Sequence, residues 1–434
     1  MATLSRRHVL GLAGLGAASL ALSACAGTGS SANRPKQKGN GTLQFWSNHP
    51  AESKKTEQKI VEAWNAAHPD TPAQLVDGGK NYEELSQKFN AALAGGDLPD
   101  VIVASDVTWF NFAFSKATTP LDDLWAENGI DPKSYVSTFV EDYTYEGKHY
   151  GVPYSRSTAL LYFDRSVLEK AGLPLDRGPS TWQEFDEWAP RIMDAGGGKP
   201  ALTIPDGTAY LDWYFEGIAW AFGGRYSEEW DLKFTDPRTI DAGRFLQDQV
   251  RKGHIEITKD AINNFGIGTA SGLLESTGSL GGLKEIAGFP ITTTPLPGPA
   301  PGCPTGGAGL SIPDGISDER KRTAIQFVDF LTNTQNTITF TQATGYIPVR
   351  IAAHEDPEEV AFLNQNPNAR TAFGQLQGNT KPQDYARVFV NGAGRRIGGA
   401  LDKITTGDAD VEKTFGSLQA RIGDAINRDI KPYL

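Results

Sequence analysis

The stretch that decides the fold reads TLQFWS at residues 42–47, KKTEQKIVEAWNAAH at 54–68, AQLV at 73–76, YEELSQKFNAALA at 82–94 and VIVAS at 101–105. The three short apolar runs predict strands, and the two longer segments carry apolar residues at helical spacing. A strand–helix–strand–helix–strand order predicts parallel strands joined by right-handed crossovers. The sequence therefore predicts an α/β fold.

A second group of elements follows the same pattern further along the chain. Strands are predicted at 150–153, 159–163 and 201–204, and helices at 166–171 and 182–195. The rest of the chain is predicted to be mostly helical, at 239–252, 279–286, 318–332, 358–365, 370–377, 395–405 and 411–427. A chain of 434 residues with 39% hydrophobic content can bury two cores, so two packed domains are expected.

Charge and cysteine content exclude several classes of function. The formal net charge of −11 argues against a nucleic-acid partner, because phosphates require a basic face. Two cysteines cannot build a disulfide scaffold or a cysteine-based zinc site. Cys303 has no histidine near it in the sequence and is interpreted as structural.

The sequence also lacks the usual motifs of catalysis. Its six histidines are dispersed, and none has the spacing of a metal site such as His-Glu-x-x-His. It contains no Gly-x-Ser-x-Gly elbow and no Walker loop. We therefore expect no metal, no cofactor and no enzymatic activity. A secreted glycosidase or phosphodiesterase is the alternative from a different class of protein.

Residues 1–24 have the features of an export signal. Arg6 and Arg7 precede an apolar run at 9–24, which ends in small residues before Cys25. At about 1.5 Å per residue this run is too short for a bilayer core of roughly 30 Å, so it is not a membrane span. The arginine pair resembles a twin-arginine signal, and Leu-Ser-Ala-Cys resembles a lipobox in which Cys25 carries the lipid. An ordinary secretory signal with an incidental cysteine is the alternative.

Residues 25–41 contain no large apolar side chain, which predicts a flexible tether. Folded structure is expected to begin near Thr42. The protein is thus expected outside the cytoplasm, at the outer face of the cell membrane, where Cys25 anchors it.

Six segments carry a pattern that is typical of a known family. They are LPDV at 98–101, KHYGVPYSRST at 148–158, LYFD at 161–164, LEKAGLP at 168–174, WQEF at 182–185 and TGYIP at 344–348. Together they resemble the extracellular solute-binding proteins of ABC importers. The resemblance runs from about residue 42 to the C-terminus, and within the family it is strongest to members that bind sn-glycerol 3-phosphate and glycerophosphodiesters such as glycerophosphocholine.

This resemblance implies a two-lobe periplasmic-binding-protein fold, type II-like, with a hinge and a ligand cleft that closes on the ligand. The N-terminal lobe is expected to comprise residues 42–155 plus about 305–350, and the C-terminal lobe 156–304 plus about 351–434. The implied function is capture of glycerophosphodiesters or sn-glycerol 3-phosphate for uptake by ABC permease subunits in the membrane, with the binding protein a monomer. An oligosaccharide-binding protein of a carbohydrate importer is the alternative with the same fold.

The resemblance places three residues of the first lobe and its border in the cleft. Tyr82 is expected to donate its hydroxyl to the ligand, although an aromatic residue at a helix start is also a common packing staple. Asp106 follows the strand at 101–105, where open α/β sheets bind ligands, and its carboxylate can accept from polyol hydroxyls. It could instead be only the N-cap of a helix at 107–116. Ser157, in a predicted Ser-Arg-Ser-Thr turn, is expected to contact a ligand oxygen.

Three further positions are expected to bind the phosphate. Ser276 opens a helix, where free N–H groups can face an anion, although ordinary helix capping explains the same residues, with Thr277 and Ser279 as neighbours. Gly307 matches a glycine whose backbone approaches the ligand closely, the alternative being a bulge or a strand entry. Tyr346 corresponds to another tyrosine that contacts the ligand.

The family supplies one arginine to the phosphate from a late helix. Arg387, Arg395 and Arg396 are the candidates, and the pair Arg395 and Arg396 is favoured without a choice between them. A guanidinium can bind phosphate through two parallel hydrogen bonds. Whichever of the pair is not the ligand is expected to be a solvated helix charge.

Two aromatic residues bear on the size of the ligand. Trp213 aligns with a family tryptophan that forms a wall of the pocket. Tyr210 stands where members specific for glycerol 3-phosphate have a second tryptophan. The smaller side chain would leave room beyond the phosphate, and tyrosine faces near Asp106 could receive a trimethylammonium group by cation–π attraction. Glycerophosphodiesters are therefore ranked above free glycerol 3-phosphate.

Overall fold

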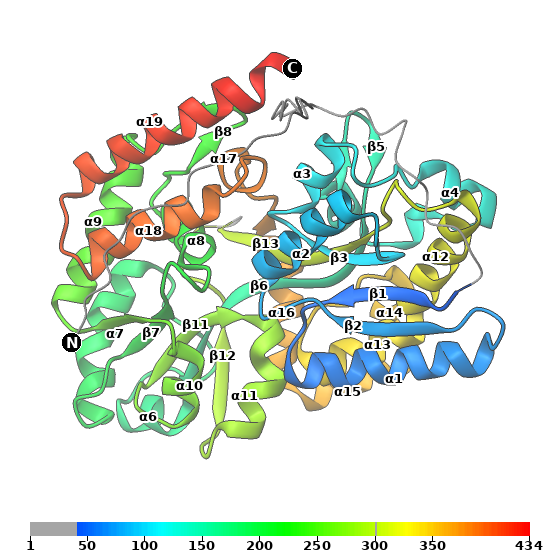
Figure 1. The fold of residues 1–434 in the computed structure, drawn as a ribbon. Coiled ribbons are helices and arrows are strands. Elements are labelled where there is room, and N and C mark those ends of the chain that lie inside the picture. The colour runs from blue at the N-terminus through cyan, green and yellow to red at the C-terminus, as the bar shows by residue number, and fades with distance from the viewer. Residues whose placement is uncertain (1–40, 300–301) are drawn as a thin grey trace, which may run out of the picture. The chain divides into compact units, whose positions relative to one another are not determined.

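The computed structural model describes residues 41–299 and 302–434 (Figure 1). The export signal, Cys25 and the tether up to residue 40 lie outside the described residues, so the expectations about them stay predictions. Residues 41–434 belong to one compact unit. Within the described ranges, no helix combines the length and the apolar character needed to cross a bilayer.

The strands of the described chain vary from two to thirteen residues. They are β1 (Leu43–Ser47), β2 (Ala73–Asp77), β3 (Val101–Ser105), β4 (Thr144–Tyr145), β5 (Lys148–His149), β6 (Val152–Asp164), β7 (Leu202–Pro205), β8 (Ser227–Glu228), β9 (Asp231–Leu232), β10 (Ile255–Thr258), β11 (Gly272–Ser276), β12 (Ile291–Thr294), β13 (Cys303–Ser311) and β14 (Thr380–Lys381).

The helices are α1 (Ala51–Ala67), α2 (Tyr82–Gly95), α3 (Trp109–Phe114), α4 (Asp122–Asn128), α5 (Ser137–Glu141), α6 (Arg165–Lys170), α7 (Trp182–Ala195), α8 (Leu211–Ala221), α9 (Pro237–Arg251), α10 (Ala261–Gly266), α11 (Leu280–Ile286), α12 (Asp318–Leu331), α13 (Thr334–Thr344), α14 (Ile351–His354), α15 (Pro357–Gln365), α16 (Pro367–Asn379), α17 (Tyr385–Val388), α18 (Ala393–Thr405) and α19 (Val411–Asp429). Short 3-10 turns are η2 (Pro132–Ser134), η3 (Thr277–Ser279) and η4 (Lys431–Tyr433).

One mixed sheet runs through the molecule in the order β10-β7-β11-β6-β13-β3-β1-β2. β1 pairs in parallel with β2 and with β3, which confirms the parallel arrangement predicted from residues 42–105. β6 and β13 lie in the middle of the order and run antiparallel to each other and to their outer neighbours. Figure 1 shows helices packed around this sheet on both of its halves.

The long strand β6 connects the two halves of the sheet. Its first part, Val152–Thr158, pairs with β13, and Ala159–Phe163 pairs with β11. The sequence predicted two strands here with a Ser-Arg-Ser-Thr turn between them, and that turn is wrong. Residues 155–158 pair with β13, and Arg156 O accepts from the N–H of Ile347 at 2.8 Å, so tertiary context overrides their local preference.

β13 was also missed, because its sequence CPTGGAGLS resembles a loop. Its glycines are needed for packing. A Cβ at Gly306 would meet the ring of Trp213 at 2.4 Å, and one at Gly309 would meet the ring of Tyr143 at 2.8 Å. Close approach of aromatic rings to the backbone therefore explains glycine within a central strand.

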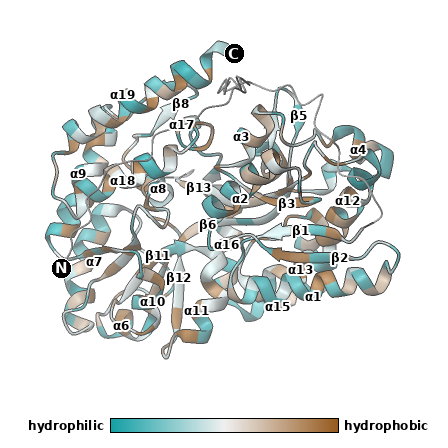
Figure 2. Cartoon of the chain, in the orientation of Figure 1, coloured by the Kyte–Doolittle hydropathy of each residue, from teal (hydrophilic) through white to brown (hydrophobic). Residues whose placement is uncertain are grey.

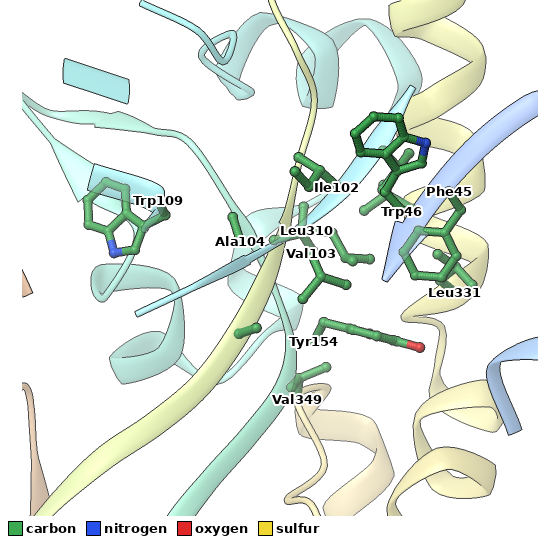
Figure 3. Packing of buried hydrophobic residues seen from close by; sticks show 14 of the residues in the cluster. Phe45, Trp46, Ile102, Val103, Ala104, Trp109, Tyr154, Leu310, Leu331 and Val349 are labelled. Carbon is green, nitrogen blue, oxygen red and sulfur yellow. The ribbon is translucent and has the colours of Figure 1, made fainter. Parts of the chain in front are cut away.

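Two clusters of buried hydrophobic side chains fill the halves of the molecule. In the first, Phe45 and Val103 from β1 and β3 pack with Tyr154 and with Leu331 from α12 (Figure 3). The second is built on the other half, from side chains such as Phe163 of β6 and from α8, α9 and α19. Helices at the outside are amphipathic, as the alternating colours of α1 and α19 show (Figure 2).

A buried ion pair ties the start of β3 to α12. Asp100 is fully buried, and its carboxylate accepts from Arg320 Nε at 2.6 Å and from the backbone N–H of Gln44 at 2.7 Å. The guanidinium also contacts the backbone carbonyls of Gly41 and Thr42 at 3.4 Å. Breaking a buried ion pair by removing one charge costs about 3–5 kcal/mol.

Asp100→Asn is therefore expected to lower the free energy of unfolding by about 3–5 kcal/mol in urea denaturation. Asp97→Asn is the matched control, because Asp97 is exposed on the same loop. A change within about 0.5 kcal/mol is expected for the control. Equal effects of the two variants would contradict the structural role of the pair.

Candidate functional site

A cavity of about 590 Å³ lies where segments from both halves of the sheet meet. Apart from Arg395 and Arg396, every cleft residue expected from the sequence lines it: Tyr82, Asp106, Ser157, Tyr210, Trp213, Ser276, Gly307 and Tyr346. Some of these residues lie at element ends or in loops, whereas Ser157 and Gly307 lie within the strands β6 and β13. The fold thus gathers them at one place.

Tyr82 and Tyr210 face each other across the cavity. Asn81 caps α2 by accepting from the N–H of Glu84, which sets Tyr82 at the first position of the helix. The two rings lie 6.3 Å apart between centroids. Tyr210 has a left-handed backbone with φ of 74° directly before α8, and its side chain is 37% exposed. A bulky residue in this conformation is strained, and such strain is typical of functional positions.

Asp106 is held by contacts with two other segments. Its N–H donates to Gly307 O at 3.0 Å, and its carboxylate accepts from the side-chain amide of Gln383. Arg387 Nη1 lies 3.4 Å from the same carboxylate oxygen. The N-cap residue of α3 is Thr108, so the alternative that Asp106 caps this helix is not what the structure shows.

Arg387, on the short helix α17, is the arginine of the cavity. Its side chain is 2% exposed, Nε donates to Asp212 at 2.7 Å, and Nη1 donates to Gln383. Burial alone would lower the pKa of Arg387, but the carboxylates of Asp212, Asp106 and Glu216 raise it above its ordinary value. The guanidinium is therefore charged and fixed in orientation.

The third nitrogen of this guanidinium is free to bind a ligand. No described residue accepts a hydrogen bond from Arg387 Nη2, and this atom is not among the unpartnered atoms that are sealed from solvent. Arg387 is among the residues that line the cavity, so Nη2 is the guanidinium nitrogen left to bind a ligand.

The structure places Arg395 and Arg396 outside this cavity, which departs from the sequence-based preference for that pair. Arg395 is on the outer face of α18, 65% exposed, and forms an ion pair with Glu83 of α2. Arg396 Nη1 donates to the backbone carbonyl of Asn391 at 2.7 Å. Both follow Gly392, which precedes α18 in a left-handed conformation. Neither arginine lines the 590 Å³ cavity.

Ser276 lies at the end of β11, where the strand turns into η3. Its hydroxyl accepts from the N–H of Gly278 at 3.2 Å, so the local capping expected as the alternative is present, and the residue lines the cavity as well. Glu275, beside it, is another lining residue. Glu275 is not predicted from the sequence, although its place next to Ser276 at a strand end is a usable signal.

Two aromatic rings form walls by packing on glycines. Trp213 lies over Gly306, and its indole N–H donates to Thr305 O at 3.1 Å. Tyr346 lies over Gly278, where a Cβ would meet the ring at 2.7 Å, and it stacks on Phe340 at 5.5 Å. Burial raises the pKa of Tyr346 to about 12, so its hydroxyl stays protonated and can donate.

A second cavity of about 610 Å³ adjoins the first and shares Asn81, Tyr82, Tyr210 and Arg387 with it. Its other lining residues include Thr108, Asn111, Asp402 and Arg395, so one of the two arginines favoured from the sequence lies at this second space. The tyrosine pair and Arg387 therefore stand at the border between two connected spaces. A ligand with a charged centre and two arms fits such a layout.

A metal centre is not formed by the described residues, among which no group of three His, Cys, Asp or Glu side chains is placed to hold an ion. Cys303 is buried, and this burial raises the pKa of its thiol to about 12. The thiol is therefore protonated at neutral pH and a poor nucleophile.

Comparison with protein families gives a match over residues 59–371 to a family described as bacterial extracellular solute-binding protein. This chain belongs to that family. Its fold is accordingly the two-lobe α/β fold of periplasmic binding proteins, as expected from the sequence.

Relatives of this solute-binding protein are similar over most of its length. It is 26% identical over 394 residues to the sn-glycerol-3-phosphate-binding periplasmic protein UgpB of Salmonella typhimurium, covering 86% of this chain and 87% of that one. It is 44% identical to UgpB from Mycobacterium tuberculosis, solved in complex with glycerophosphocholine, with a TM-score of 0.87, covering 90% of this chain and all of that one.

A sugar-binding relative shares the fold. The GacH receptor of Streptomyces glaucescens, solved unliganded and with acarbose, matches with a TM-score of 0.78 at 20% identity, covering 90% of this chain and 100% of that one. At 20% identity, this likeness shows only that the two proteins share a fold.

A substitution at Gly307 tests whether β13 requires glycine at this position. Its φ is 102°, and a Cβ there would lie 1.9 Å from Ser155 O. Gly307→Ala is therefore expected to lower the free energy of unfolding by on the order of 2–6 kcal/mol. Thermal or urea unfolding measures this loss.

Gly282→Ala is the matched control for that change. Gly282 also lines the cavity, but it is in α11 and a Cβ there meets nothing within 4 Å. Alanine in a helix is favoured over glycine by roughly 0.5–1 kcal/mol, so this variant should be slightly more stable than the wild type. A Gly307→Ala protein as stable as the control would show that the strand does not need glycine.

Proposed function

We propose that this protein is the substrate-binding lipoprotein of an ABC importer and that it captures glycerophosphodiesters, such as glycerophosphocholine, for uptake. The observation that carries the proposal is the guanidinium of Arg387, which is buried, held by Asp212 and Gln383, and open to the cavity through Nη2. A fixed guanidinium in a cavity is suited to an anionic oxygen, because charge-assisted hydrogen bonds are the stronger ones.

In this proposal the phosphate lies at Arg387, with Ser276, the backbone of Gly307 and the hydroxyl of Tyr346 as further contacts. The glycerol hydroxyls bind to Asp106 and Tyr82, and Ser157 contacts a ligand oxygen. Trp213 and Tyr210 form the walls around the remaining arm of the ligand. All of these residues line the cavity, which supports the arrangement.

The charge of the site favours a diester over free glycerol 3-phosphate. Two carboxylates, those of Asp106 and Asp212, already approach the guanidinium of Arg387. A phosphodiester carries one negative charge, and glycerophosphocholine balances it with its own ammonium group. The phosphate monoester of glycerol 3-phosphate approaches two negative charges at neutral pH, and Arg387 is the one buried Arg or Lys among the residues that line this cavity.

The alternative ligand is an oligosaccharide. Aromatic walls and carboxylates also suit sugars, and a sugar-binding receptor shares the fold. The buried charge of Arg387 favours the glycerophosphodiester over the oligosaccharide, because an uncharged sugar forms no ion pair with a guanidinium fixed in this position.

We further propose that the protein acts without catalysis, as a monomer that delivers its ligand to permease subunits in the membrane. Membership of a family of solute-binding proteins supports this assignment. Incubation with glycerophosphocholine is expected to return the ligand unchanged, and release of choline or glycerol would contradict it.

Calorimetric titration of the Arg387→Gln variant tests the ligand assignment. The variant is expected to bind glycerophosphocholine about ten- to a hundredfold more weakly than wild type, because a charge-assisted contact contributes about 1.5–3 kcal/mol. Arg387→Lys keeps a charge beside Asp212 and is expected to retain the fold and lose the directed hydrogen bonds.

Arg396→Gln is the matched control, since this arginine of α18 lines neither cavity. The affinity of this variant is expected to equal that of wild type. If Arg396→Gln lost affinity while the Arg387 variants bound like wild type, the phosphate would be assigned to Arg396 instead. Wild-type protein that binds an uncharged disaccharide and no glycerophosphodiester would support the sugar alternative.

The lipid anchor is tested by Cys25→Ala. Without the sulfur that carries the lipid, the protein is expected to appear in the medium or to remain unprocessed. Cell fractionation followed by immunoblotting measures the distribution. Processed variant that stays in the membrane fraction would contradict anchoring through Cys25.

A further inference from the structure

Glu275 is a carboxylate in the cavity that the proposed contacts do not use. It lies at the end of β11 and is 5% exposed. Its Oε1 atom accepts from the hydroxyl of Tyr214 at 2.6 Å, from the N–H of Ser276 at 2.8 Å and from the hydroxyl of Ser279 at 3.3 Å. Three donors from three directions therefore fix the orientation of this carboxyl group.

The other oxygen of Glu275 has no such partner. No hydrogen bond joins Oε2 to any residue that the structure describes. Oε2 is also not one of the unpartnered side-chain atoms that are sealed from solvent, so it keeps accessible surface. Because Glu275 lines the cavity, that surface faces the ligand space. An oriented, largely buried carboxyl group thus presents one oxygen where a ligand would lie.

We propose that Glu275 determines ligand specificity by holding the cationic head group of a glycerophosphodiester, so that the site selects choline-type and other ammonium head groups over neutral ones. This inference rests on the proposed function. A carboxylate oxygen attracts an ammonium group strongly in a cavity with little water. Two carbon atoms separate phosphate and nitrogen in glycerophosphocholine, so a phosphate held beside Ser276 brings its head group near Glu275.

The surrounding rings suit such a head group. Tyr214, which donates to Glu275, is in ring contact with Trp213 at 5.1 Å between centroids. Tyr346 lines the cavity on the opposite segment, over Gly278. Aromatic faces beside a carboxylate are the usual surroundings of bound quaternary ammonium groups.

The groups that face Glu275 from neighbouring elements are neutral phenols. They are Tyr162 of β6, Tyr214 of α8 and Tyr346 after α13, and burial raises the pKa of each above its ordinary value. Charged or titratable side chains elsewhere on the cavity lining are Glu52, Lys80, Asp106, Lys259, Glu285, Arg387, His49, Tyr82 and Tyr210. None of these is among the causes that shift the pKa of Glu275.

Burial raises the pKa of Glu275 to about 7, against the lowering effect of its three hydrogen bonds. In the empty site the group is therefore partly protonated at neutral pH. The ammonium head group favours the ionised form, so its binding is expected to strengthen as pH rises through about 7 and to level off above it. A neutral head group gains nothing from ionisation.

The test compares glycerophosphocholine with its neutral isostere, in which a carbon atom replaces the nitrogen, by calorimetry at pH 5.5 and pH 8.5. The phosphodiester charge is constant over this range. Wild type is expected to bind glycerophosphocholine about tenfold more tightly at the higher pH, with little change for the isostere. At pH 8.5 it should prefer the charged ligand by about tenfold or more.

Glu275→Gln keeps an oxygen for the three donors, so the fold is expected to persist, and it removes the charge. The variant should lose both the rise of affinity with pH and the preference for the charged ligand. Glu285→Gln is the matched control, because Glu285 is an exposed residue lining the same cavity. It should retain both properties.

The outcomes separate the two proposals. In one outcome, the folded Glu275→Gln variant binds glycerophosphocholine with the same preference over the neutral isostere and the same rise of affinity with pH as wild type. That result would overturn the role of Glu275 and would leave the proposed function unaffected. Failure of wild type to bind either ligand at any pH would overturn the proposed function itself.

Discussion

Thirteen consecutive residues of β6, Val152–Asp164, pair with β13 along their first part and with β11 and β12 along the rest. This continuous strand joins the two halves of the sheet, and the binding site is built directly on it. Ser157 lies in its middle, and its partner strand β13 carries Gly307, whose carbonyl accepts from the N–H of Asp106. The central strand pair therefore sets the positions of residues from both lobes around one cavity.

The charge network around Arg387 depends on that arrangement. Asp106 follows β3, Asp212 belongs to α8, and Gln383 precedes α17, yet all three contact one guanidinium. Each carboxylate alone would be costly in this interior, and the guanidinium alone would be as well. Together they compensate each other, and they leave Nη2 for a ligand. The same contacts connect the two lobes across the cavity.

Tight packing of rings on glycines gives the cavity its shape. Trp213 rests on Gly306 and Tyr346 on Gly278, so side chains at either glycine would displace a wall. The aromatic surfaces are thus held against backbone, which moves less than side chains do. Polar groups such as Glu275 are then oriented by donors from neighbouring elements, and their free oxygen has a defined direction.

Much of the fold could be predicted locally. Helices such as 182–195 and the strand 101–105 have the same bounds in sequence and structure, because hydrophobic periodicity and capping residues act over short distances. The glycine-rich strand β13 could not be found this way, since it is stabilised by partners distant in the sequence. The same reason explains the false turn within β6.

The sequence by itself determined the α/β class, the family and eight of the residues that line the cavity, because strand ends, helix starts and family segments are local patterns. Only the tertiary structure decided which arginine reaches the cavity. Arg387, Arg395 and Arg396 are equally basic in the sequence, but Arg387 is buried against Asp212 whereas Arg395 is exposed beside Glu83. Asp212 and Glu83, the acidic partners that distinguish these two arginines, lie more than a hundred residues away from them in the sequence. Only the folded chain brings each arginine to its partner.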